Sequence, residues 1–148
     1  MIHSLQHLIS LVDNLQKDAK PLWGKMSSQH MVEHLVYSLQ ISNGKLNVGC
    51  FIPKERWATM KKILLSDRPL PKNFINPIIG EDLPSLIHTS LNESIDVLKK
   101  EYSDYLQYYR LHPEATQLNP TFGELNGVEW EVFHQKHFAH HFEQFGLL

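Results

Sequence analysis

The sequence contains a single cysteine, no long hydrophobic run and no excess of basic residues. Cys50 cannot form an internal disulfide, which suits a reducing compartment. No apolar run approaches the roughly 18 residues that a membrane-spanning helix needs. The stretch from Met1 to Val12 has neither a basic region nor a long apolar core. We therefore expect no membrane span and no signal peptide, and we predict a cytoplasmic location.

Several classes of protein are disfavoured by what else is missing. The 14 Lys and Arg residues are balanced by 16 Asp and Glu, and they form no basic stripe, which argues against nucleic-acid binding. The sequence has no glycine-rich phosphate loop, no G-x-S-x-G elbow and no HEXXH motif. Cys50 lies outside any Cys–His signature, so a cysteine nucleophile is disfavoured.

Hydrophobic residues make up 42% of the 148 residues, which indicates one globular domain over 1–148. Asn126 and Glu129 form a pattern typical of a capping box, and Gly146 follows as a stop signal for the last helix. Asn43 and Gly44 supply the stop signal for the second helix. Helical periodicity, read with these signals, predicts helices over 4–20, 29–42, 54–66, 85–111 and 126–145.

The predicted architecture is all-α. No alternating apolar and polar run predicts a strand, and residues 119–125 are expected to form a loop. Four substantial helices and one short helix predict a four-helix bundle. Residues 43–84 would then be a long crossover that carries the short helix, with a proline-rich loop at 68–77.

The last predicted helix is unusually rich in histidine. His134, His137 and His141 share one face with Trp130, and His140 lies to one side. A single histidine on such a face is usually a hydrogen-bonded core residue. Three on one face favour a shared metal ion, because each buried imidazole needs a partner and one ion can satisfy several.

The second predicted helix offers the further ligand that a metal would need. His30 and His34 are four residues apart and lie with Tyr37 away from the apolar face. Periodicity leaves open whether this side faces solvent or a site. The other histidines are not part of such a cluster, and we interpret them as surface or locally hydrogen-bonded residues: His3, His7, His88 and His112.

Two segments of the sequence carry a resemblance to a known family. They are PLWGKMSSQHMVEHL at 21–35 and FGELNGVEWEVFHQKHFAHHFEQFGL at 122–147. In motif order, spacing and helix position they resemble an uncharacterised branch of the DinB-like superfamily, which also contains the YfiT-like metal-dependent hydrolases. Residues between about 45 and 110 support the resemblance only through the number of helices.

The resemblance implies a four-helix bundle with up-down-down-up topology and a divalent metal near one end. In the family three histidines hold the ion, and the matching residues here are His34, His137 and His141. Zinc or nickel would be the expected metal, with iron or manganese as alternatives. Characterised relatives include thiol-dependent transferases and isomerases, which implies a small-molecule substrate and a low-molecular-weight thiol as partners.

This sequence departs from the family pattern at several positions. Asn119 stands where the branch commonly has histidine. His30 and His134 are additional histidines that could compete as ligands or support them, and His112 or Asn119 could also approach the ion. The sequence alone leaves these alternatives open.

A mechanism follows as a hypothesis. A divalent ion would promote loss of a proton from water or a substrate thiol, which would then attack an electrophile in hydrolysis or thiol transfer. His30, His134 or Glu33 would be candidates for proton transfer. The competing interpretation is a non-catalytic helical module for binding or dimerisation, with a structural metal or none. We also expect a homodimer, and pH sensing by the histidines is a third idea.

Overall fold

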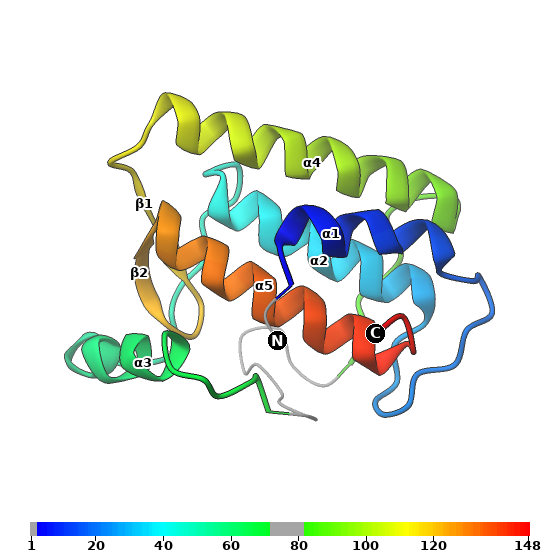
Figure 1. Ribbon diagram of the computed structural model, residues 1–148, viewed down its shortest axis with the longest axis horizontal. Helices are drawn as coiled ribbons and strands as arrows, with labels where there is room; N and C mark the ends of the chain where they lie inside the picture. Colours follow the sequence, from blue (N-terminus) through cyan, green and yellow to red (C-terminus); the bar gives the residue numbers. More distant parts are fainter. Residues whose placement is uncertain (1–2, 72–81) are drawn as a thin grey trace.

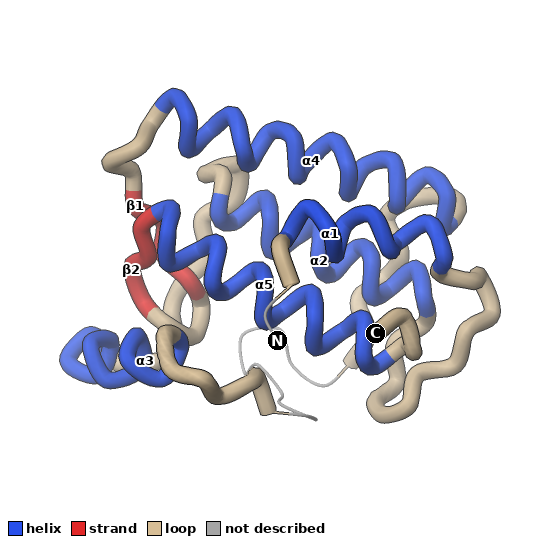
Figure 2. Tube along the Cα trace, in the orientation of Figure 1, coloured by secondary structure: helices blue, strands red, loops and turns tan. Residues whose placement is uncertain are grey.

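The computed structural model describes residues 3–71 and 82–148, and this part of the chain is mostly helical with one small two-stranded sheet (Figure 1). Helix α2 packs against α4 and α5, and α1 packs against α5 (Figure 2). The elements are α1 (Leu5–Leu11), the 3-10 turn η1 (Val12–Asn14), α2 (Ser28–Ser42), the 3-10 turn η2 (Lys54–Arg56), α3 (Trp57–Leu64), α4 (Leu91–Leu111), β1 (Thr116–Asn119), β2 (Gly123–Asn126) and α5 (Gly127–Gln144).

The start of α5 and the end of α2 confirm the sequence-based predictions. Asn126 accepts a hydrogen bond from the Glu129 backbone N–H, and the Glu129 carboxylate accepts one from the Asn126 N–H, which completes the capping box. Asn43 ends α2, and Gly44 follows with φ +81°, a conformation that glycine adopts without a steric penalty.

Two predicted helices are too long. The first helix ends at Leu11 and continues only as the turn η1, not to residue 20. The predicted helix over 85–111 begins at Leu91, since Ser90 caps it by accepting from the Glu93 N–H. The backbone N–H groups of Ile87 and His88 donate instead to the Glu33 carboxylate on α2, so this segment is held by a side chain and not by helical bonds.

The expectation of a loop at 119–125 is wrong in part. Strands β1 and β2 pair antiparallel, with Gln117 opposite Leu125 and Asn119 opposite Gly123. Each strand has only four residues, which is too short for a clear alternating pattern. Gly123 has φ +83°, and a Cβ there would lie 2.5 Å from the Trp57 ring, so the hairpin packs directly on α3. The short helix predicted at 54–66 is confirmed as η2 and α3.

The hydrophobic core lies among α1, α2, α4 and α5. Its largest fully buried side chains on α5 are Trp130, Phe138 and Phe142. Burying such side chains supplies most of the free energy that holds the helices together, at about 1.5–3 kcal/mol for each large apolar group. Of the predicted loop at 68–77, only 68–71 is described, and 72–77 lies outside the described residues. No helix in the described ranges is long and apolar enough to span a membrane.

Candidate metal centre

Helices α2 and α5 bring three imidazoles together. His34 comes from α2, while His137 and His141 are one turn apart on α5. The His137 Nε2 lies 2.9 Å from the His34 Nε2 and 3.2 Å from the His141 Nε2, and all three atoms lie within 4.8 Å of one another. Nitrogen ligands of a tetrahedral zinc ion are about 3.3 Å apart, given Zn–N bonds of roughly 2.0–2.1 Å. The spacing of these atoms therefore fits a shared divalent ion.

The buried surroundings keep these three imidazoles neutral. Burial, together with the nearby His140, lowers the pKa of His34 to about 4. Burial and the neighbouring histidines hold the pKa values of His137 and His141 well below the usual range of histidine. A neutral imidazole has one nitrogen with a free lone pair, which is the form that binds a metal. Convergent nitrogens in this state suit a cation placed between them.

The three histidines open onto a pocket of about 960 Å³. Its wall is mostly apolar and comes from five parts of the chain: residues 23–26, α2, the end of α3 with the segment after it, residues 82–87, and the hairpin with α5. A cavity of this size with a few convergent polar groups is typical of small-molecule sites. His140 lies beside the cluster, with its ring in edge contact with Trp23 and with His141.

His134, a candidate for proton transfer, lies in the core and away from the pocket wall. Its Nε2 lies 2.8 Å from the Ser42 Oγ, and its ring stacks on Trp130. Complete burial lowers its pKa to about 3. Its Nδ1 has no hydrogen-bond partner among the described residues. These contacts favour a structural role for His134.

Glu33 and His30, the other two candidates for proton transfer, both make contacts with the segment before α4. The Glu33 carboxylate accepts hydrogen bonds from two backbone N–H groups and from two side chains, Gln29 and Ser94. Burial raises its pKa, but these four bonds together hold the pKa below the usual value. His30 lines the pocket, with its Nε2 3.1 Å from the Pro84 carbonyl and its Nδ1 2.7 Å from the Ser27 Oγ. The hydrogen bonds of Glu33 and His30 therefore hold the segment before α4 against α2, which is a structural role.

Asn119 lies in the pocket wall, but its oxygen is already used. The Asn119 Oδ1 accepts hydrogen bonds from the backbone N–H groups of Thr121 and Phe122, and its Nδ2 has no partner among the described residues. A metal would bind an amide through oxygen, so this geometry disfavours Asn119 as a ligand. His112 caps the C-terminus of α4 beside Tyr108 and is absent from the pocket wall.

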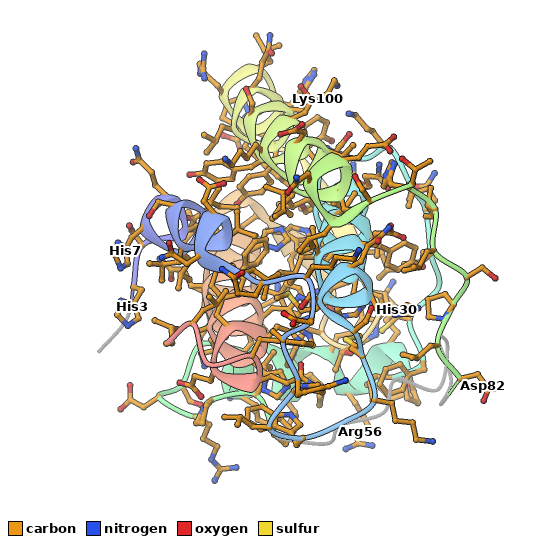
Figure 3. All side chains as sticks on the ribbon, turned by 90° about the vertical axis from the view of Figure 1, so that its right-hand side faces the viewer. His3, His7, His30, Arg56, Asp82 and Lys100 are labelled. Carbon is orange, nitrogen blue, oxygen red and sulfur yellow. The ribbon has the colours of Figure 1, made fainter. Side chains whose placement is uncertain are left out.

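Figure 3 shows His7 on α1 and His3 just before this helix, on the opposite side of the view from His30. These two rings stack on each other with centroids 5.5 Å apart. His88 lies in the segment before α4, where its Nδ1 is 3.5 Å from a Glu93 carboxylate oxygen. None of the three contributes to the histidine cluster, which agrees with their interpretation from sequence.

Two residues of α5 that the sequence-based site omitted support the cluster and its pocket. The Gln144 Oε1 lies 2.8 Å from the His141 Nδ1, three residues away and therefore on the same side of the helix. The Lys136 Nζ donates to the carbonyls of Leu64, Ser66 and Arg68 at 2.6–2.7 Å, which fixes the chain after α3 beside the pocket. Helical spacing from His141 could have indicated Gln144 as a neighbour of the cluster. Nothing in the sequence indicates which carbonyl groups accept from Lys136.

A scan of protein-family models and searches of curated proteins and of solved structures found no match to this chain. The similarity to the DinB-like superfamily therefore stays a prediction based on the two sequence segments.

Proposed function

We propose that this protein binds one divalent metal ion through the Nε2 atoms of His34, His137 and His141, and that the site acts on a small molecule in the adjoining pocket. The observation that carries the proposal is the convergence of these three atoms within 4.8 Å, from two helices and far apart in sequence. In the same proposal the fold is a four-helix bundle of the DinB-like type, with α1, α2, α4 and α5 as its helices.

The number of ligands supports a catalytic site over a structural one. Structural zinc sites are usually closed by four protein ligands, whereas catalytic sites keep a position open. No fourth His, Cys, Asp or Glu joins the cluster in the described ranges. A bound ion would supply positive charge that makes water or a thiol more acidic, for hydrolysis or thiol transfer. The chain itself contributes the fixed imidazoles and an apolar wall that limits access of water.

The three imidazole ligands limit which metals would bind at the site, but they do not select a single metal. Three imidazoles suit zinc, nickel, copper or iron, and affinity alone does not separate these metals. We propose zinc or nickel, with iron or manganese as alternatives, and a low-molecular-weight thiol as one candidate substrate. The thiol rests on the family resemblance alone.

A second candidate function is a helical binding or dimerisation module. Exposed apolar side chains on α4 and at the start of α5 favour it, since Leu111 is 64% and Val128 75% exposed. Leu106 and Val128 also line a shallow second depression between these helices. Sedimentation of the wild-type protein and a Val128→Lys variant would test this: a dimer that the variant loses supports the proposed homodimer, and a wild-type monomer contradicts it.

Elemental analysis tests the metal site directly. Untagged protein, purified without a metal column, should contain about one divalent ion per chain, and the His137→Ala variant should contain none. His140→Ala is the matched control, because it removes a neighbouring histidine of α5 that is not one of the three ligands. A wild-type protein that takes up no zinc, nickel, iron or manganese on incubation would overturn the proposal. Retention of the ion by His137→Ala would overturn the assignment of ligands.

A further inference from the structure

Gln144, at the end of α5, connects a proposed metal ligand to the wall of the pocket. Its side chain is buried and makes two hydrogen bonds of 2.8 Å. The amide Nε2 donates to the backbone carbonyl of Trp23, and the amide Oε1 lies next to the His141 Nδ1. Trp23 precedes α2 in the chain, so this side chain joins residues 121 positions apart.

The chemistry of these partners determines which atoms carry protons. A carbonyl oxygen can only accept, so the Trp23 carbonyl must face the NH₂ of the Gln144 amide. The amide oxygen then faces the His141 Nδ1, which must carry the proton and donate it. In a neutral imidazole the other nitrogen keeps its lone pair, so the His141 Nε2 is left as the ligand atom, 3.2 Å from the His137 Nε2. The fixed amide therefore selects the metal-binding tautomer of His141.

The wall segment is fitted closely against the same residue. The Leu22 N–H donates to the Gln144 backbone carbonyl at 2.7 Å. Gly24 has φ +80°, and a Cβ on it would come within 2.9 Å of the Gln144 Nε2, so the backbone needs glycine both for its conformation and for the close approach. Trp23, Gly24, Lys25 and Met26 all line the pocket.

His137 provides a contrast within the same cluster. Its Nδ1 is buried and has no hydrogen-bond partner among the described residues. Metal-bound histidines usually donate their second N–H to an oxygen acceptor, and loss of such a partner costs about 10–100-fold in metal affinity. Of the two ligands on α5, His141 is therefore the one whose orientation the described residues fix through this second nitrogen.

We propose that Gln144 is a positioning residue that couples metal binding to the order of the pocket wall. Its oxygen holds His141 in the tautomer that binds the ion, and its NH₂ group holds residues 22–26 against α5. The inference rests on the proposed metal site. Because coupling between two sites is reciprocal, binding of the ion should order the wall, and loosening the wall should weaken binding.

Two substitutions separate the two hydrogen bonds. Gln144→Glu keeps an acceptor for His141 but removes the donor to Trp23, whereas Gln144→Met removes both at similar volume. Glu143→Gln is the matched control on the neighbouring exposed position. The readouts are zinc affinity, from competition with a chromophoric chelator, and backbone hydrogen exchange of peptides covering 21–26 with and without zinc. Circular dichroism establishes that each variant is folded.

We expect Gln144→Met to bind zinc about 10–100-fold more weakly than the wild type. Gln144→Glu should bind zinc more tightly than Gln144→Met, because its carboxylate still accepts from the imidazole N–H of His141, and this stronger acceptor offsets the loss that comes from the loosened wall. Zinc should slow exchange over 21–26 in the wild type and in Glu143→Gln. In Gln144→Glu this slowing should be lost although zinc still binds.

Each contrary result has a separate meaning. Equal zinc affinity of the wild type and Gln144→Met would overturn the positioning role while leaving the metal site intact. Zinc-dependent protection that persists in Gln144→Glu would overturn the coupling through the Trp23 carbonyl. A wild-type protein that binds no zinc, nickel, iron or manganese would overturn both this inference and the proposed function.

Discussion

His134 and His137 are one turn apart on α5 and both are buried, yet their Nε2 atoms face different kinds of partner. The His134 Nε2 lies against the Ser42 hydroxyl, which donates its own proton to the Leu39 carbonyl and therefore accepts from the His134 N–H. The His137 Nε2 lies between two further imidazole nitrogens, at 2.9 and 3.2 Å. The N-terminal half of α5 therefore places histidine as part of the core. The C-terminal half brings imidazole lone pairs together, and only a shared metal ion or a proton can interact with all of them at once.

The same contrast extends to the other side chains of the two halves. In the N-terminal half, the Trp130 indole N–H donates to the Gln117 carbonyl and its ring is fully buried. In the C-terminal half, Gln144 bonds to a histidine and to the pocket wall. A polar side chain satisfied within the core contributes stability, whereas the convergent imidazole nitrogens that Gln144 supports indicate a ligand. Stability and metal binding should therefore respond to different substitutions along one helix.

The largest effect on stability should come from Trp130→Ala in the N-terminal half. We expect a loss of about 3–5 kcal/mol in the free energy of unfolding, because a fully buried indole is replaced by a cavity. The zinc affinity of the folded variant should be unchanged. Urea unfolding and zinc titration measure the two quantities, and a weakened affinity would show that the halves are not independent.

Of the two halves of α5, only the C-terminal half should contribute to stabilisation by the metal. Zinc at 100 times its dissociation constant should raise the free energy of unfolding of the wild type by about 2.7 kcal/mol. His141→Ala should gain nothing, and His134→Phe should gain as much as the wild type. Thermal unfolding with zinc and with a chelator measures this. A full gain in His141→Ala would remove the distinction between the two halves.

Acid should destabilise the metal-free protein in part through His134. Its folded pKa of about 3 lies below the unfolded value of 6.5, so the unfolded chain binds the additional proton as the pH falls below 6.5. Stability is therefore lost on acidification, and the loss from this residue at pH 5 is about 2 kcal/mol relative to pH 8. His134→Phe should lose that much less than the wild type over the same interval. Identical pH dependence of the two proteins in urea unfolding would contradict it.

The smallest effect should come from the cap of α5. Asn126→Ala removes the side chain that accepts from the Glu129 N–H, and we expect a loss of about 1 kcal/mol. Zinc affinity should not change, since the cap lies at the opposite end of the helix from His141. Chemical unfolding and chelator competition provide the two measurements. A parallel loss of affinity would indicate that fraying of the first turn reaches the site.

The sequence predicted those features that depend on neighbours along the chain. The capping box at Asn126 and the end of α2 at Asn43 are local signals, and both are confirmed. The pairing of His137 with His141 follows from helical spacing in the same way. That His34 faces these two was implied only by the family resemblance, because its own helix left solvent and site equally open. Its partner lies 103 residues away, and only the packing of α2 near α5 decides the matter.

The features that sequence reasoning missed depend on distant contacts. Residues 85–90 have a helical pattern, but the Glu33 carboxylate accepts from the N–H groups of Ile87 and His88, and the segment before α4 is not helical. The hairpin of β1 and β2 forms from strands of four residues, and Gly123 lets it approach Trp57. In both places the conformation depends on a tertiary contact and differs from the one that the local sequence pattern favours. A single sequence does not reveal such a contact.

Lys136 also attaches the long connection between α2 and α4 to helix α5. A flexible loop costs more conformational entropy as it lengthens, by about 0.6 kcal/mol for each doubling. The Lys136 Nζ donates to the carbonyls of Leu64, Ser66 and Arg68. These hydrogen bonds attach the long connection between α2 and α4 to α5 partway along its length, at the end of α3, and so shorten the free loop. The Leu64 carbonyl belongs to α3, so local unfolding at the end of this helix breaks a hydrogen bond to α5. One ammonium group thereby links the end of α3 and the segment after it to α5, the helix that carries two of the three clustered histidines.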